Sequence, residues 1–98
     1  MISSQTIQTS IDELKAITKV DLSVYDPTGM VVASTTSQDD IAGELISGFA
    51  SSPADSQVIG QHHLLKILDE GELLYILVAK GMSDDVYMVG KIAVCQLQ

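Results

Sequence analysis

Arginine is missing from this 98-residue chain, whose only positive side chains are the lysines Lys15, Lys19, Lys66, Lys80 and Lys91. Thirteen acidic residues outnumber them and leave a formal net charge of −8. Proteins that bind nucleic acids need basic side chains to neutralise phosphates and release counterions. We therefore expect no direct contact between this domain and DNA or RNA.

Cysteine and long apolar runs are also scarce. Cys95 is the only cysteine, which excludes an internal disulfide and is typical of a reducing cytoplasm. The first ten residues, MISSQTIQTS, lack the basic start and the apolar stretch of a signal peptide. No apolar run approaches the roughly 18 residues that indicate a membrane span. We expect a cytoplasmic protein that makes no contact with a membrane.

Motifs that carry catalysis or bind metals are absent as well. The chain has no glycine-rich phosphate loop and no G-x-S-x-G motif. His62 and His63 are neighbours on a predicted strand, so their side chains point to opposite faces and do not converge on one metal. Cys95 lies on an apolar helical stripe and is expected to be buried and unreactive. The sequence predicts no enzyme activity, no metal and no cofactor.

Hydrophobic periodicity predicts the order of helices and strands. Ile7, Ile11 and Leu14 form one stripe of a first helix that Ser3 or Ser4 caps. Residues 20–35 form a β-hairpin around the turn Asp26-Pro27-Thr28-Gly29. The remaining elements are a helix from Gln38 to about Ser51 that buries Ile41, Leu45, Ile46 and Phe49, strands at about His62–Leu68 and Glu72–Lys80, and a helix over about 84–98.

These elements predict an α+β fold in the order α-β-β-α-β-β-α, with a central antiparallel sheet of four or five strands flanked by helices. Val58 and Ile59 would supply the fifth, short strand. The two later strands are apolar at nearly every central position, which indicates that both faces of the sheet are covered. The whole chain, residues 1–98, is expected to be one domain.

The last helix carries an unusually wide apolar arc. Hydrophobic residues make up 46 % of the chain, which favours a surface reserved for another subunit. The helix also has no C-terminal capping signal, so we expect it to continue into a longer protein. We predict a homodimer through the first and last helices, with its interface on Ile7, Ile11, Leu14, Val86, Val89, Ile92, Ala93 and Leu97.

Lys66 is the most informative polar residue, because a lysine in an apolar strand must extend to solvent, pair with an acid or face a cavity. An acid such as Asp21 on a neighbouring strand is the structural partner, and an anionic ligand is the functional one. Strand alternation and the loop 51–57 suggest a ligand pocket lined by Tyr25, Ser34, Ser56, Gln57, His63, Lys66 and Tyr75.

Three stretches, DLSVYDPTGMVVAST (21–35), SPADSQVI (52–59) and ELLYILVAKGMSDDVYMVGKIAVCQLQ (72–98), resemble the N-terminal domain of bacterial transcription regulators of the carbohydrate diacid regulator type, which are similar to purine catabolism regulators. The resemblance implies a PAS-, GAF- or profilin-like sensor fold. It also implies a small-molecule effector, a sugar acid or another metabolite, whose signal passes through the last helix to a DNA-binding domain beyond residue 98.

One departure limits this resemblance. Family members that recognise sugar diacids carry an Arg-Ile-Gly motif and a following histidine after the first hairpin, whereas this chain has TSQDDIAGELISGF at residues 36–49. Arginine is the residue best suited to binding carboxylates through two hydrogen bonds. The diacid specificity is therefore not carried over. The alternative function is a protein-interaction or dimerisation module of the roadblock or profilin-like type that binds no small molecule.

Overall fold

A computed structural model describes residues 3–36 and 41–98. Its helices are α1 (Ser4–Thr18), α2 (Gly43–Ser51) and α3 (Val86–Leu97). Its strands are β1 (Asp21–Tyr25), β2 (Val31–Ser34), β3 (Ser56–Ile59), β4 (His62–Asp69) and β5 (Glu72–Lys80). The α+β class and the antiparallel sheet are confirmed. The predicted element order omitted β3, which lies between α2 and β4.

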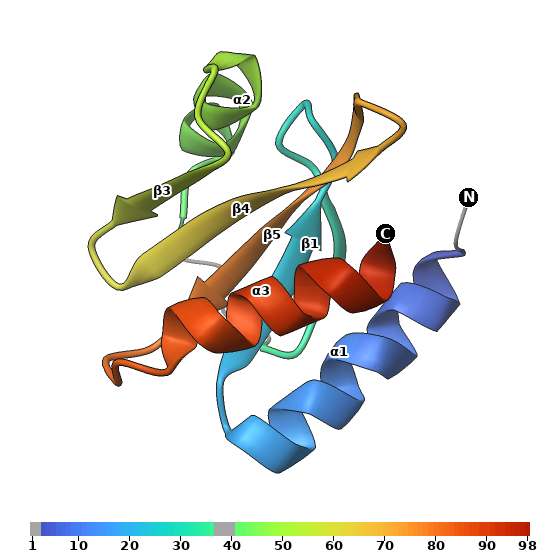
Figure 1. The fold of residues 1–98 in the computed structure, drawn as a ribbon, viewed down its shortest axis with the longest axis vertical. Coiled ribbons are helices and arrows are strands. Elements are labelled where there is room, and N and C mark those ends of the chain that lie inside the picture. Colours follow the sequence, from blue (N-terminus) through green and yellow to red (C-terminus); the bar gives the residue numbers. More distant parts are fainter. Residues whose placement is uncertain (1–2, 37–40) are drawn as a thin grey trace.

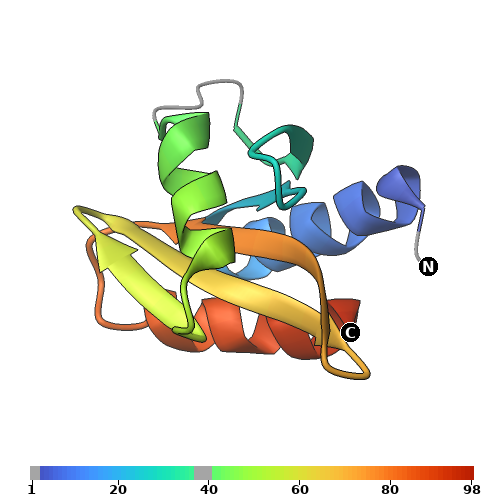
Figure 2. The same cartoon turned by 90° about the horizontal axis from the view of Figure 1, so that it is seen from above.

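The five strands form one sheet in the order β2-β1-β5-β4-β3, and every neighbouring pair is antiparallel. Helices α1 and α3 cover one face, and α2 stands on the other (Figures 1 and 2). Strand β5 occupies the centre between β1 and β4, and β2 and β3 are the two edge strands. The middle of the molecule is therefore a three-layer arrangement, as the apolar strands predicted.

Each face of the sheet has its own hydrophobic core. Because successive strand side chains point to opposite faces, β4 and β5 contribute to both cores. The core under α1 and α3 includes Ile7, Ile11, Leu22, Val24, Leu65, Leu77, Val86, Ala93 and Leu97. The core under α2 consists of Tyr25, Ile41, Ile46, Phe49, Leu64, Ile76 and Val78. Burial on both faces fixes the register of the central strands.

Helix α1 begins at one of the two caps that its sequence predicts. The Ser3 hydroxyl accepts a hydrogen bond from the Thr6 N–H at 3.2 Å, so Ser3 is the N-cap. At the other end, Lys19 adopts a left-handed conformation with φ 64°, and its N–H donates to the Lys15 carbonyl at 2.8 Å. The stripe of Ile7, Ile11 and Leu14 faces the sheet and is buried.

The β1–β2 turn is organised by Asp26 and by a close contact with α2. The Asp26 carboxylate accepts hydrogen bonds from the Thr28 hydroxyl at 2.6 Å, the Thr28 N–H at 2.9 Å and the Met30 N–H at 3.1 Å. Gly29 has φ +99°, and a Cβ added there would lie 2.5 Å from the Gly43 carbonyl oxygen. Glycine is thus required at Gly29 both by its conformation and by the space available.

Helix α2 is shorter than predicted. The predicted start at Gln38 lies outside the described residues. The regular helix begins at Gly43, and Ile41 is buried although it precedes the helix. Leu45 was expected in the core, but 45 % of it is exposed. Ile46 and Phe49, three residues apart on one face, provide the buried contact instead.

Helix α3 buries a narrower arc than predicted. Val86, Val89, Gly90, Ala93, Val94 and Leu97 face the core, whereas Tyr87, Met88, Ile92 and Cys95 are exposed. The prediction that Cys95 is buried was wrong, because position 95 points away from the sheet when Val94 and Leu97 point toward it.

Candidate functional site

The two edge strands of the sheet, β2 and β3, differ in the contacts that they make with the rest of the chain. On β2, the Gln8 side chain reaches from α1 and bonds to both backbone polar groups of Ser34, at 2.7 Å to the carbonyl oxygen and 3.1 Å to the N–H. Ser34 lies opposite Ser23, between hydrogen-bonded positions of the β1–β2 ladder, so its backbone groups point away from β1. Gln8 therefore occupies the place that another strand would take.

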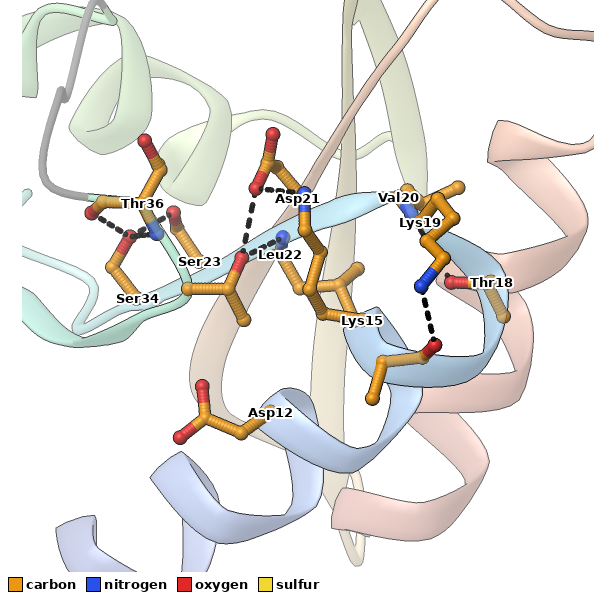
Figure 3. Close-up of polar contacts among 12 residues, drawn as sticks. Asp12, Lys15, Thr18, Lys19, Val20, Asp21, Leu22, Ser23, Ser34 and Thr36 are labelled. Atoms are coloured by element: carbon orange, nitrogen blue, oxygen red, sulfur yellow. Dashed lines mark hydrogen bonds and ion pairs between the residues drawn. The ribbon is translucent and has the colours of Figure 1, made fainter.

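A network of polar side chains reinforces the same end of the sheet (Figure 3). The hydroxyls of Ser23 and Ser34 lie 2.9 Å apart, and the Ser34 hydroxyl donates to the Thr36 carbonyl at 2.9 Å. The Lys15 ammonium forms an ion pair of 2.7 Å with Asp21, which joins α1 to β1. At the Ser34 end, the β2 edge is thus covered by the chain's own side chains.

Strand β3 has no such cover within residues 3–36 and 41–98. The Lys66 N–H donates to the Asp55 carbonyl at 3.1 Å, so alternation along the ladder directs the backbone groups of Ser56 and Val58 outward. These groups make no hydrogen bond in the described part of the chain. Val58 is 59 % exposed, and the strand SQVI contains neither charge nor proline. Natural proteins commonly use charges or proline to block a free edge.

Next to β3, a hollow of about 180 Å³ lies between α3 and β4. One flank of α3 forms a wall with Tyr87, Lys91, Val94 and Gln98, whose spacing of four, three and four residues places them on one helical stripe. The residues that complete the hollow are Asp55, Ser56, Leu65, Lys66 and Leu68.

A second, more open hollow of about 390 Å³ lies at the start of α3, where its lining residues include His63, Gln61, Ser83 and Asp84. The centroids of the His63 and Tyr87 rings lie 6.2 Å apart. The Nδ1 atom of His63 is buried and has no hydrogen-bond partner among the described residues. His63 was grouped with Tyr25 and Tyr75 in the predicted ligand pocket. Its neighbour is Tyr87 because position 63 faces α3.

The seven residues of the predicted ligand pocket do not converge. Tyr25 is 1 % exposed in the core under α2, whereas Tyr75 packs against the core under α1 and α3. Ser34 belongs to the network beside α1, and Gln57 lies on the open strand β3. Ser56 and Lys66 line the smaller hollow, and His63 lines the larger one.

Lys66 has a structural role that the sequence did not predict. Its ammonium donates to the Ser52 carbonyl at the end of α2 and lies 5.2 Å from the centroid of the Phe49 ring. The expected partner, Asp21, pairs with Lys15 instead. Lys66 therefore holds the C-terminal end of α2 against the sheet, where a cation also compensates the helix dipole.

The predicted dimer interface coincides with the monomer's own core. Ile7, Ile11, Leu14, Val86, Val89, Ala93 and Leu97 are each at most 8 % exposed within one chain. Among the eight predicted residues, Ile92 alone is exposed, at 43 %. Contact between copies through the other seven would require α1 and α3 to leave the sheet.

Asp26 is the described titratable group whose pKa is most clearly changed by its surroundings. The hydrogen bond from the Thr28 hydroxyl, together with those from the N–H groups of Met30 and Thr28, lowers the pKa of the Asp26 carboxyl below its ordinary value of 3.8. This effect concerns the β1–β2 turn and not either hollow.

Within the described residues, no three His, Cys, Asp or Glu side chains are arranged to hold a metal ion. No described helix has both the length and the apolar character needed to cross a bilayer. No protein-family model matches the chain, and no curated protein matches it either.

Several important residues of this region were not singled out by sequence reasoning. Gln8, Asp55, Tyr87, Lys91 and Gln98 are polar or exposed residues with no motif around them. The spacing of residues 87, 91, 94 and 98 was the one available signal, because it marks a helical stripe beside the buried one.

Proposed function

We propose that this chain is a regulatory domain that pairs with a second copy of itself through the open edge of β3. The observation that carries the proposal is a contrast between the edges: Gln8 bonds to the outward-facing backbone groups of Ser34 on β2, whereas those of Ser56 and Val58 on β3 make no hydrogen bond in the described part of the chain. Unpaired strand edges are the usual place where a strand from another chain adds to a sheet.

The β3 edge can accept a second copy because the strand itself carries no charge. The chain carries a net charge of −8, so two copies repel each other over most of their surfaces. The strand Ser56–Ile59 is uncharged, and it presents the exposed Val58. Pairing of two β3 strands about a two-fold axis would join both sheets and cover Val58 on each copy.

The resemblance to transcription regulators of the carbohydrate diacid regulator type supplies the biological setting of the proposal. In such a protein the domain would bring two DNA-binding regions together. Helix α3 packs on β4 and β5, and β4 is the neighbour of β3, so a change at the β3 edge would reach α3 through one strand. We propose α3 as the element that passes the signal onward.

The test is sedimentation velocity of the domain and of two matched edge variants. Val58→Lys places a charge on the β3 edge, and Val31→Lys places the same charge at an exposed position of β2. We expect the unmodified chain and Val31→Lys to be dimers and Val58→Lys to be a monomer. A monomeric unmodified chain, or equal association of both variants, would contradict pairing through β3.

The regulatory setting has its own test in the gene. The reading frame around this segment is expected to encode a helix-turn-helix region on the C-terminal side. A reading frame that encodes no DNA-binding region would overturn this setting and leave the pairing proposal intact.

Small-molecule sensing is a second candidate function. The observation that favours it is the hollow beside α3, which lies between the proposed transmitting helix and the proposed pairing strand. The residues first predicted for a ligand pocket do not form one, so a sensing function would depend on this hollow instead.

A further inference from the structure

Two residues of β3 present their backbone groups to the open side of the sheet. The Lys66 N–H donates to the Asp55 carbonyl at 3.1 Å, so Asp55 is a hydrogen-bonded position of the β3–β4 ladder. Because hydrogen-bonded and non-hydrogen-bonded positions alternate in an antiparallel pair, Gln57 is also bonded to β4. The N–H and carbonyl groups of Ser56 and Val58 point outward instead, and a strand that adds to this edge must bond to them.

The side chains of β3 divide between the two faces of the sheet. Ser56 lies opposite Leu65, whose side chain belongs to the core under α1 and α3. Gln57 lies opposite Leu64, whose side chain belongs to the core under α2. Since strand side chains alternate, Val58 shares the face of Ser56. The outward-facing backbone groups and the exposed Val58 therefore belong to the same two positions of the strand.

Two-fold symmetry restricts how a second copy can align with this edge. In an antiparallel pair, outward-facing residues of one copy must lie opposite outward-facing residues of the other. The axis can then pass through Ser56, Gln57 or Val58. With the axis at Gln57, Ser56 of each copy lies opposite Val58 of the other, and both backbone groups of both residues are bonded.

The other two registers use residues outside the strand. An axis at Val58 places Ser56 opposite Gly60, which belongs to the β3–β4 turn and has φ +60°. That conformation is left-handed and not extended. An axis at Ser56 places Val58 opposite Ala54, which precedes β3. The register centred on Gln57 is thus the one that pairs strand with strand throughout.

Charge favours the same register. Each copy carries a net charge of −8, and Asp55 is the charged residue nearest to Gln57 along the chain. With the axis at Gln57, the two copies of Asp55 are separated by about 13 Å along the strands, beyond the Debye length of about 10 Å at 0.1 M salt. With the axis at Ser56, this separation falls to about 7 Å. Repulsion between the two copies is therefore weaker in the register centred on Gln57.

We propose that two copies pair in this single register, with the Gln57 side chains facing each other across the two-fold axis. The inference rests on the proposed function, because it specifies how the second copy aligns at the same edge. Gln57 forms a non-hydrogen-bonded pair with its equivalent, the arrangement in which facing side chains lie closest, so the two carboxamides can bond to each other. Val58 of each copy lies beside Ser56 of the other, on the face that carries both α3 helices.

The experiment is disulfide trapping of the whole chain in a Cys95→Ser background, which removes the exposed native thiol. The α-carbons of a non-hydrogen-bonded pair are about 4.5 Å apart, within the roughly 4.4–6.8 Å that a disulfide spans. Mild oxidation should therefore shift Gln57→Cys from monomer to dimer mass on a non-reducing gel. Ser56→Cys and Val58→Cys should each keep the monomer mass, because their equivalent α-carbons lie about 8 Å apart, beyond the reach of a disulfide.

Val31→Cys, at an exposed position of β2, is the matched control and should also keep the monomer mass. Sedimentation velocity of the reduced variants distinguishes the register from pairing itself. If the reduced variants are dimers but Ser56→Cys or Val58→Cys cross-links more than Gln57→Cys, the register is wrong and pairing through β3 remains. Equal cross-linking of Gln57→Cys and Val31→Cys overturns the register as well. If all the reduced variants are monomers, the proposed pairing fails and the register fails with it.

Discussion

The carboxamide of Gln8 hydrogen-bonds to both backbone polar groups of Ser34: Nε2 donates to the carbonyl oxygen at 2.7 Å, and Oε1 accepts from the N–H at 3.1 Å. These residues are 26 positions apart, and their contact fastens α1 to the outer edge of β2. A side chain thus satisfies the groups that an edge strand normally leaves to solvent or to another protein.

Gln8→Ala should lower the free energy of unfolding by about 1–2 kcal/mol, because it removes two partly buried hydrogen bonds and leaves the Ser34 backbone without a partner. Urea denaturation followed by circular dichroism measures the change. Gln5→Ala is the control, since Gln5 lies on the same helix with an exposed side chain. An equal effect of both substitutions would mean that the Gln8–Ser34 contact contributes nothing to stability.

Lys66→Met should destabilise the domain by about 1–2 kcal/mol, although it keeps the apolar stem of the side chain. The substitution removes the hydrogen bond to the Ser52 carbonyl and the contact of the ammonium with the Phe49 ring. Hydrogen exchange should show faster opening of α2 than of α1 and α3. Lys91→Met is the matched control at an exposed position, and it should leave exchange in α2 unchanged.

The sequence was sufficient to predict most of the helices and strands of the fold. Period-two and period-3.6 patterns located α1, the first hairpin, β4, β5 and α3 because these elements each bury one or both faces. The position of the core was also predictable at Ile7, Ile11 and Leu14. The short strand β3 was only suggested, at Val58 and Ile59. Three of its four residues are exposed, so hydrophobic periodicity gives no signal for it.

The candidate site was far less predictable from the sequence than the core. Its residues come from the end of a loop, an edge strand, β4 and one flank of α3, and only tertiary packing brings Asp55 and Lys91 to one hollow. Strand alternation alone could not tell which face Tyr25, His63 and Tyr75 share. It also could not assign a partner to Lys66, because the Ser52 carbonyl becomes available only where α2 ends.

Asp26 should make stability depend on pH in the acid range. Its folded-state pKa is lowered, chiefly by the Thr28 hydroxyl, so its contribution is fully present above the unfolded value of 3.8 and is lost as the pH falls through the lowered pKa. The unmodified chain should therefore be more stable than Asp26→Asn at neutral pH, and the difference should shrink below about pH 4. Denaturant titrations of both proteins at several pH values measure this difference. A difference that does not change with pH would show that the Asp26 charge does not stabilise the turn.

Two glycine substitutions should change stability in opposite directions. Gly48→Ala should raise the free energy of unfolding by about 0.5–1 kcal/mol, because Gly48 lies inside α2, is exposed, and has no atom within 4 Å of an added Cβ. Gly29→Ala should lower it by at least about 1–2 kcal/mol, because alanine is disfavoured at φ +99° and its Cβ would lie 2.5 Å from the Gly43 carbonyl oxygen. Thermal and urea unfolding of the two variants test both signs. If Gly29→Ala left the free energy of unfolding unchanged, the β1–β2 turn would not press against the start of α2. The close approach of Gly29 to Gly43 could then not be what positions this helix over its core.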